Sequence, residues 1–62
     1  MIKRLSNWLL QAPGLRTATI ATDQTGAFIV RLTSGGDVVA RCTSTIVESA
    51  LSRALDVAEG VS

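Results

Sequence analysis

Residues 16–43 read RTATIATDQTGAFIVRLTSGGDVVARCT, and apolar and polar side chains alternate along three runs of this segment. A period of two, together with many Thr, Val and Ile residues, predicts β-strands. The expected strands are Thr17–Thr22, Ala27–Thr33 and Asp37–Thr43. Glycine-containing segments separate them, so we expect two hairpins and a three-stranded antiparallel meander.

The two connections set the register of this sheet. Each suits a three-residue loop, a type I turn followed by a left-handed glycine, so we predict loops at Gln24–Gly26 and Ser34–Gly36. Loop length fixes which residues share a face. A two-residue loop at Gly35-Gly36 would place Arg41 on the core side, which favours the three-residue interpretation. The resulting core face is almost wholly apolar: Ala18, Ile20, Thr22, Phe28, Val30, Leu32, Val38, Ala40 and Cys42.

Helical periodicity flanks the meander. Apolar positions recur at spacings of three and four over residues 2–12, and a proline-glycine pair ends this segment. After the third strand, Thr45 and Glu48 match a capping box, which predicts a helix start. Gly60 followed by Val61 matches a glycine C-cap with its apolar contact. The apolar residues of the two helices are Ile2, Leu5, Trp8, Leu9 and Ala12, then Ile46, Val47, Ala50, Leu51, Ala54, Leu55, Val57 and Ala58.

These patterns predict one small α+β domain over residues 1–62 with the order α-β-β-β-α. A chain of this length buries only roughly 60% of its extended-chain surface. Small scaffolds are usually stabilised by disulfides, a metal or a partner chain. The sequence has one cysteine, Cys42, and no histidine, so an internal disulfide is impossible and a zinc site is not expected. Oligomerisation or unusually good packing remains, and we expect a homo-oligomer.

The expected location follows from the same composition. A lone cysteine is consistent with a reducing compartment. No run approaches the roughly 18 apolar residues that span a bilayer, and Trp8-Leu9-Leu10 is too short for the apolar part of a signal peptide. We expect a complete, cytoplasmic protein that does not act at a membrane.

The sequence lacks the residues that catalysis requires. Histidine is absent, and Asp23 and Asp37 belong to turns at opposite ends of the meander, so they cannot share a substrate. Cys42 is expected to face the core as a small apolar side chain. Gly35-Gly36 connects two strands, which is not the context of a phosphate-binding loop. We therefore expect no enzyme activity, catalytic residue, cofactor, metal or small-molecule substrate.

The other face of the predicted sheet is the first candidate binding surface. It carries Thr17, Thr19, Ala21, Ile29, Arg31, Thr33, Val39, Arg41 and Thr43. Arg31 and Arg41 are predicted to be diagonal neighbours that one acidic group can bridge. With Ile29 and Val39 at its centre, the face has the composition of an interaction surface. The alternative is a solvated face, in which threonines supply β-propensity and arginines supply solubility.

Trp8 is a second candidate contact residue. One interpretation is that it covers the open end of the core beside the last helix, because the other apolar residues of its own helix are core types. The other interpretation is that it anchors an interface, since tryptophan is enriched at binding hot spots.

The order helix–strand–strand–strand–helix resembles that of double-stranded RNA-binding domains over nearly the whole chain. The most similar part is Gly36–Ser44, which leads into an alanine-rich helix. Members of that family bind RNA phosphates with a lysine cluster at the start of their last helix. The equivalent residues here, Ser44–Glu48, include no cation, so that activity is not implied. The three strands and the last helix are also similar in order to small antitoxins of the HicB type, which neutralise a toxin by direct binding.

Two functional hypotheses follow. The first is a non-catalytic protein–protein interaction module that self-associates and acts as a small regulatory or inhibitory, antitoxin-like accessory protein. Its expected partner-binding residues are Arg31, Arg41, Ile29, Val39 and Trp8. The second hypothesis is nucleic-acid binding through a basic face formed by Arg16, Arg31 and Arg41. The formal net charge of +1 favours the first, because nonspecific nucleic-acid binding depends on many phosphate contacts.

Overall fold

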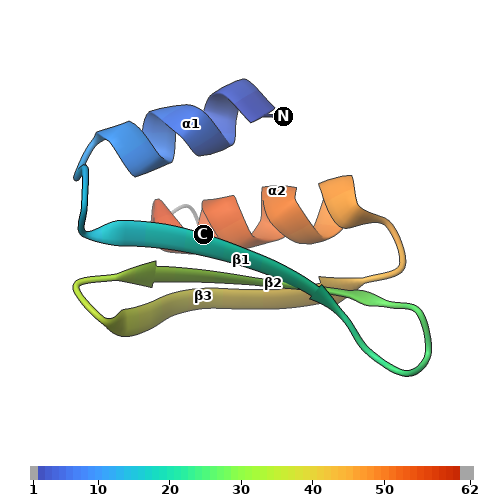
Figure 1. The fold of residues 1–62 in the computed structure, drawn as a ribbon. Helices are drawn as coiled ribbons and strands as arrows, with labels where there is room; N and C mark the ends of the chain where they lie inside the picture. Colours follow the sequence, from blue (N-terminus) through green and yellow to red (C-terminus); the bar gives the residue numbers. More distant parts are fainter. Residues whose placement is uncertain (1, 61–62) are drawn as a thin grey trace.

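The computed structural model describes residues 2–60, with side chains from residue 3 onward. Its elements are helix α1 (Ile2–Leu10), strands β1 (Arg16–Thr22), β2 (Phe28–Ser34) and β3 (Asp37–Ser44), and helix α2 (Val47–Ala58). The strands form one open antiparallel sheet in the order β1-β2-β3. Both helices lie on the same side of this sheet (Figure 1), so they leave its other face open. The predicted α+β class and α-β-β-β-α order are confirmed.

The first hairpin forms as predicted, with every expected pair of β1 and β2 in place. The Asp23 amide donates to the Ala27 carbonyl at 3.0 Å. Gly26 closes the loop with a φ of +87°, a conformation that glycine adopts without steric cost. The Asp23 carboxylate accepts hydrogen bonds from the Thr25 hydroxyl at 2.6 Å and the Thr25 amide at 2.8 Å. These bonds, chiefly that from the hydroxyl, lower the pKa of Asp23.

The second hairpin differs from the prediction. Its loop contains two residues, Gly35 and Gly36, whose φ angles are +62° and +89°, and Ser34 pairs with Asp37. Two consecutive left-handed residues form the tight hairpin turn whose twist matches that of the flanking strands. The glycine pair therefore closes the turn without a third residue, and the predicted loop Ser34–Gly36 is wrong.

A β-bulge interrupts the alternation of β3 and returns the residues beyond it to their predicted faces. Leu32 pairs with Ala40. Thr33 pairs with Val38, which leaves Val39 as an additional residue in β3. Because of this extra residue, the apolar side chains beyond the bulge face the core even though the loop is short. Val38, which was predicted to face the core, is instead 54% exposed.

The core lies between the sheet and the two helices. α2 packs on β2 and β3, whereas α1 packs on β1. Ala50 and Ala54 of α2 are fully buried, and their small side chains allow the helix to approach the sheet closely. Ile20 belongs to the core face of β1 but is 48% exposed, since α2 does not cover that strand. The largest fully buried side chains are Trp8, Val30, Leu32 and Leu55.

The start of α2 corrects a second prediction. The residue before the helix is Ile46, with an extended backbone, and no side chain caps the helix there. Because β3 continues through Ser44, the helix begins one residue later than a Thr45 cap requires. The predicted capping box of Thr45 and Glu48 is therefore wrong. Ser44 Oγ instead accepts a hydrogen bond from the Ile46 amide at 3.2 Å.

The end of α2 follows the prediction. Gly60 has a φ of +75°, and its amide donates to the Val57 carbonyl at 3.1 Å. The expected contact of Val61 and the side chain of Ile2 lie outside the described residues. Neither helix in residues 2–60 has the length and apolarity needed to cross a bilayer.

Interactions of two arginine side chains connect α1 to α2 and β1. Arg4 forms ion pairs with Asp56 at 2.5 Å and with Glu59 at 3.1 Å, and these bonds raise the pKa of Arg4. Arg16 lies over the Trp8 ring, 4.7 Å from its centroid, and donates to the Trp8 carbonyl at 2.9 Å. α1 is therefore held at both α2 and β1.

Candidate binding surface on the open face of the sheet

The face of the sheet opposite the helices, here called the open face, is built from three cross-strand rows. Strand pairing and alternation together place one residue of each strand in every row. The rows are Thr17–Thr33–Val38, Thr19–Arg31–Arg41 and Ala21–Ile29–Thr43. The middle row carries the two positive charges, and both neighbouring rows consist of threonine and apolar residues.

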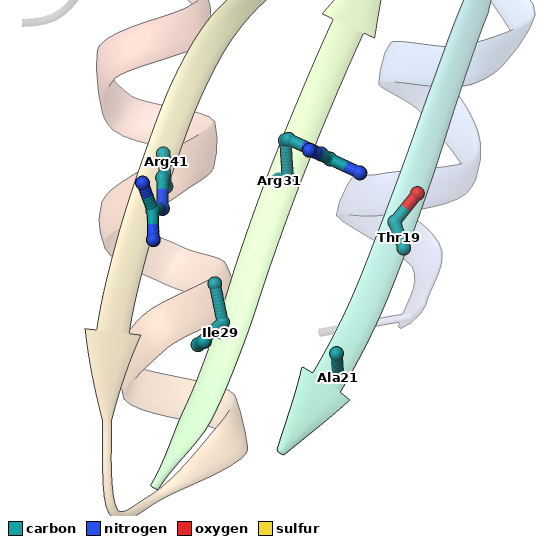
Figure 2. Close-up of a pocket in the computed structure, with 5 residues that line it drawn as sticks. All are labelled: Thr19, Ala21, Ile29, Arg31 and Arg41. Carbon is teal, nitrogen blue, oxygen red and sulfur yellow. The ribbon is translucent and has the colours of Figure 1, made fainter. Parts of the chain in front are cut away.

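A shallow depression of about 260 Å³ lies on this face. Its lining residues come from all three strands (Figure 2): Thr19, Ala21, Ile29, Arg31 and Arg41. Ala21 has a small side chain beside the larger Ile29, which leaves space between them next to the charged row. The depression therefore combines an apolar floor with guanidinium and hydroxyl groups that can donate hydrogen bonds.

Arg31 and Arg41 are directly opposite each other, which corrects the predicted diagonal placement. Hydrogen-bonded and non-hydrogen-bonded pairs alternate along an antiparallel ladder, and the Asp23–Ala27 and Gly35–Leu15 backbone bonds show which pairs of β1 and β2 are hydrogen-bonded. By this alternation the backbone amide and carbonyl of Arg31 point toward β1 and not toward β3. Directly opposite residues in such a pair have Cα atoms about 4.5 Å apart, the closer of the two spacings. In Figure 2, Arg31 extends toward Thr19 while Arg41 runs along β3, so the two guanidinium groups diverge.

The charge of this pair is uncompensated in the described part of the chain. The ion pairs found there belong to Arg4, and the Asp23 carboxylate is engaged within its own turn. Like charges directly opposite on a sheet are destabilising, typically by a few tenths to about 1 kcal/mol. Two adjacent positive charges without an acidic neighbour form a site suited to an anionic group from another molecule.

We expect replacement of Arg41 by threonine to stabilise the isolated protein. The change removes the repulsion with Arg31 and introduces a residue with high β-propensity, for a gain of about 0.2–1 kcal/mol. Urea denaturation at low ionic strength measures this gain, which should shrink as salt screens the charges. A variant less stable than the wild type at low salt would show that the pair is not repulsive.

The other sequence candidates lie elsewhere. Trp8 is only 2% exposed and belongs to the core, as one of its two interpretations states. Val39 is the bulge residue and does not line the depression. Arg16 stacks on Trp8 and is not part of the open face, contrary to the basic face predicted with Arg31 and Arg41. Cys42 is partly buried against the core, on the side predicted for it.

Two lining residues were not singled out from the sequence. Thr19 and Ala21 were assigned to the correct face, but only the paired strands show that they adjoin Ile29 and Arg31. The predicted register of the first hairpin, which places both residues beside β2, could have identified them. In residues 2–60, no group of His, Cys, Asp and Glu side chains is arranged to hold a metal ion.

Comparison with known proteins finds no matching family model, and no significant match among curated proteins or solved structures. The chemical properties of the open face are therefore the basis for a functional assignment. Two guanidinium groups, nearby hydroxyls and an apolar floor can bind an anionic group that is attached to an apolar or extended segment.

Proposed function

We propose that this protein is a non-catalytic protein-binding module, which acts as a small regulatory or inhibitory accessory protein by occupying a surface of another protein. The observation that supports this proposal is the directly opposed Arg31–Arg41 pair beside an apolar depression on the open face. Arginine beside apolar contact area is typical of protein interfaces, where it often forms the energetically dominant contacts.

The same geometry favours a protein partner over a nucleic acid. Arg16 is turned toward Trp8, so the open face carries two cations and not three. Single-stranded nucleic acids are usually bound by aromatic side chains that stack on the bases. The aromatic residues of this chain are Trp8 and Phe28; Trp8 is in the core, and the alternation along β2 places Phe28 on the helix side.

The experiment that tests the proposal is capture of binding proteins from a native host lysate on the immobilised chain. The comparison variant carries Arg31→Glu and Arg41→Glu, and it should keep the fold because both side chains are exposed. We expect a protein that binds the wild type and is lost from the variant. Equal capture by both chains would contradict the proposal.

Self-association is the second element of the proposal. Large apolar side chains remain exposed on the isolated chain, including Leu10 and Leu15, which bracket the turn between α1 and β1. Covering them in a homodimer would add apolar burial that a small core lacks. We expect light scattering to give a dimer or larger species at micromolar concentration. A strict monomer would remove this element and leave the protein-binding role intact.

A further inference from the structure

The edge of the sheet formed by β1 is the one that lacks protection. β1 begins with Arg16, whose guanidinium is turned toward Trp8. The rest of the strand, residues 17–22, contains no charge and no proline. Sheet edges are normally protected by charges, proline, bulges or a covering segment, because their backbone groups can pair with another chain. The opposite edge, β3, has such protection: Asp37, Arg41 and the bulge at Val39.

Backbone alternation identifies the groups that β1 presents outward. Asp23 donates to Ala27, and Gly35 donates to Leu15, so the hydrogen-bonded pairs of β1 and β2 are the odd-numbered residues of β1. The even-numbered residues then direct their amides and carbonyls away from β2. The outward residues are Ala18, Ile20 and Thr22. Within residues 2–60, no backbone hydrogen bond beyond the strand pairing involves them.

The charge on the open face lies within reach of this edge. Figure 2 shows Arg31 extended from β2 toward Thr19 of β1. A strand added beside β1 would place alternate side chains on the open face, in the same rows as Thr19 and Arg31. An acidic residue opposite Thr19 on that strand would therefore face the Arg31 guanidinium across β1.

We infer that the partner adds an extended segment to β1 as a fourth strand and presents an acidic side chain to Arg31. This inference rests on the proposed protein-binding function and names the element and the chemistry of recognition. Backbone pairing along Ala18, Ile20 and Thr22 supplies affinity, and the carboxylate supplies selectivity. Charge complementarity supports an acidic segment, because the charged row has no acidic neighbour in the described part of the chain.

A second copy of this chain does not supply the required charge. β1 has the sequence RTATIAT, which includes no acidic residue to place opposite Thr19. The acidic residue of β3, Asp37, pairs with Ser34 in a row on the helix side of the sheet. Asp56 of α2 and Glu59, the residue that follows this helix, are paired with Arg4 of α1. The segment that fits the β1 edge therefore belongs to a different protein.

The direct test uses a model peptide, acetyl-Thr-Val-Thr-Glu-Thr-Val-Thr-amide, titrated into the ¹⁵N-labelled full chain. Its alternation places Val, Glu and Val on one face and threonines on the other. We expect saturable amide shifts at Ala18, Ile20 and Thr22, and affinity at least about tenfold weaker when lysine replaces the glutamate, a change of about 1.4 kcal/mol. The Arg31→Glu chain should reverse this preference.

Three results would overturn the inference. The first is equal affinity for the Glu and Lys peptides, or no saturable shift at the β1 amides at millimolar peptide. The second is protection of the outward β1 amides from hydrogen exchange in the absence of peptide, increasing with protein concentration. This result would show that a second copy of the chain pairs with the edge. The third is a set of chemical shift changes at these amides on addition of single-stranded oligothymidylate but not of the Glu peptide. This result would assign the edge to nucleic-acid binding.

A backbone modification separates this inference from the proposed function. N-methylation of Ile20 in a chemically synthesised chain removes one outward amide and leaves the pairing with β2 intact. N-methylation of Thr43, whose amide points outward from β3 by the same alternation, is the matched control. Partner capture should fall at least about tenfold for Ile20 only. Capture that depends on Arg31 and Arg41 but survives Ile20 methylation would retain the protein-binding function and reject strand addition.

Discussion

Replacing Trp8 with alanine is expected to unfold a large fraction of the protein at 25 °C. Trp8 is 2% exposed, sits among the core residues of both helices and β2, and supports the Arg16 guanidinium at 4.7 Å. Truncation of a buried tryptophan costs about 3–5 kcal/mol. A domain of this size has a total stability of about 3–9 kcal/mol, so the loss approaches the whole margin.

Circular dichroism is the suitable measurement, because Trp8 is the only tryptophan and its removal abolishes intrinsic tryptophan fluorescence. Lys3→Ala is the control on the same helix: Lys3 is exposed, and its replacement should change stability by less than about 0.5 kcal/mol. Trp8→Phe should cost less than Trp8→Ala, since Trp8 Nε1 has no hydrogen-bond partner within residues 2–60. Equal stability of Trp8→Ala and wild type would show that α1 does not complete the core.

Much of the fold could be predicted because short-range chemistry determines it. Asp23 and Gly26 specify the first turn, and the register of β1 and β2 follows from that loop. Gly60 likewise ends α2 where the sequence places it. Period-two alternation also assigned Arg31 and Arg41 to the face opposite the core, which the structure confirms.

The second hairpin could not be predicted from the same pattern. A shift of two residues along β3 leaves every side chain on its original face, so Leu32 opposite Val38 and Leu32 opposite Ala40 are equally consistent with the apolar alternation. The structure resolves this ambiguity with a two-glycine turn and a bulge at Val39. The consequence for the site is that Arg31 and Arg41 are directly opposite.

Contacts made by α1 were also inaccessible to sequence patterns. Periodicity places Arg16 beside the first strand, but it does not show that the side chain folds back onto Trp8. The basic face expected from three arginines is therefore reduced to two. The same limit applies to Ile20, whose exposure depends on which strands α2 covers.

Reversing both charges of the open face should abolish partner binding. Glutamate at positions 31 and 41 replaces attraction for an acidic partner with repulsion, and close charge pairs at interfaces are typically worth several kcal/mol. We expect at least about a 100-fold loss of affinity, which corresponds to about 2.7 kcal/mol. The variant should remain folded, because it exchanges one uncompensated like-charge pair for another on an exposed face.

Arg53→Glu on α2 is the control for net charge, since Arg53 is exposed and lies on an element that does not line the depression. It should retain binding, whereas an interaction driven only by overall charge would weaken in both variants. If the chain instead bound nucleic acids of any sequence, with an affinity that falls steeply as salt increases, the open face would be assigned to phosphate binding.

The most direct measurement is the affinity of a captured partner for three chains side by side: wild type, Arg31→Glu with Arg41→Glu, and Arg53→Glu. The open-face account predicts tight binding by the first and third and loss of binding by the second, with all three giving the same circular dichroism spectrum. Undiminished binding by a correctly folded Arg31→Glu and Arg41→Glu chain would contradict it.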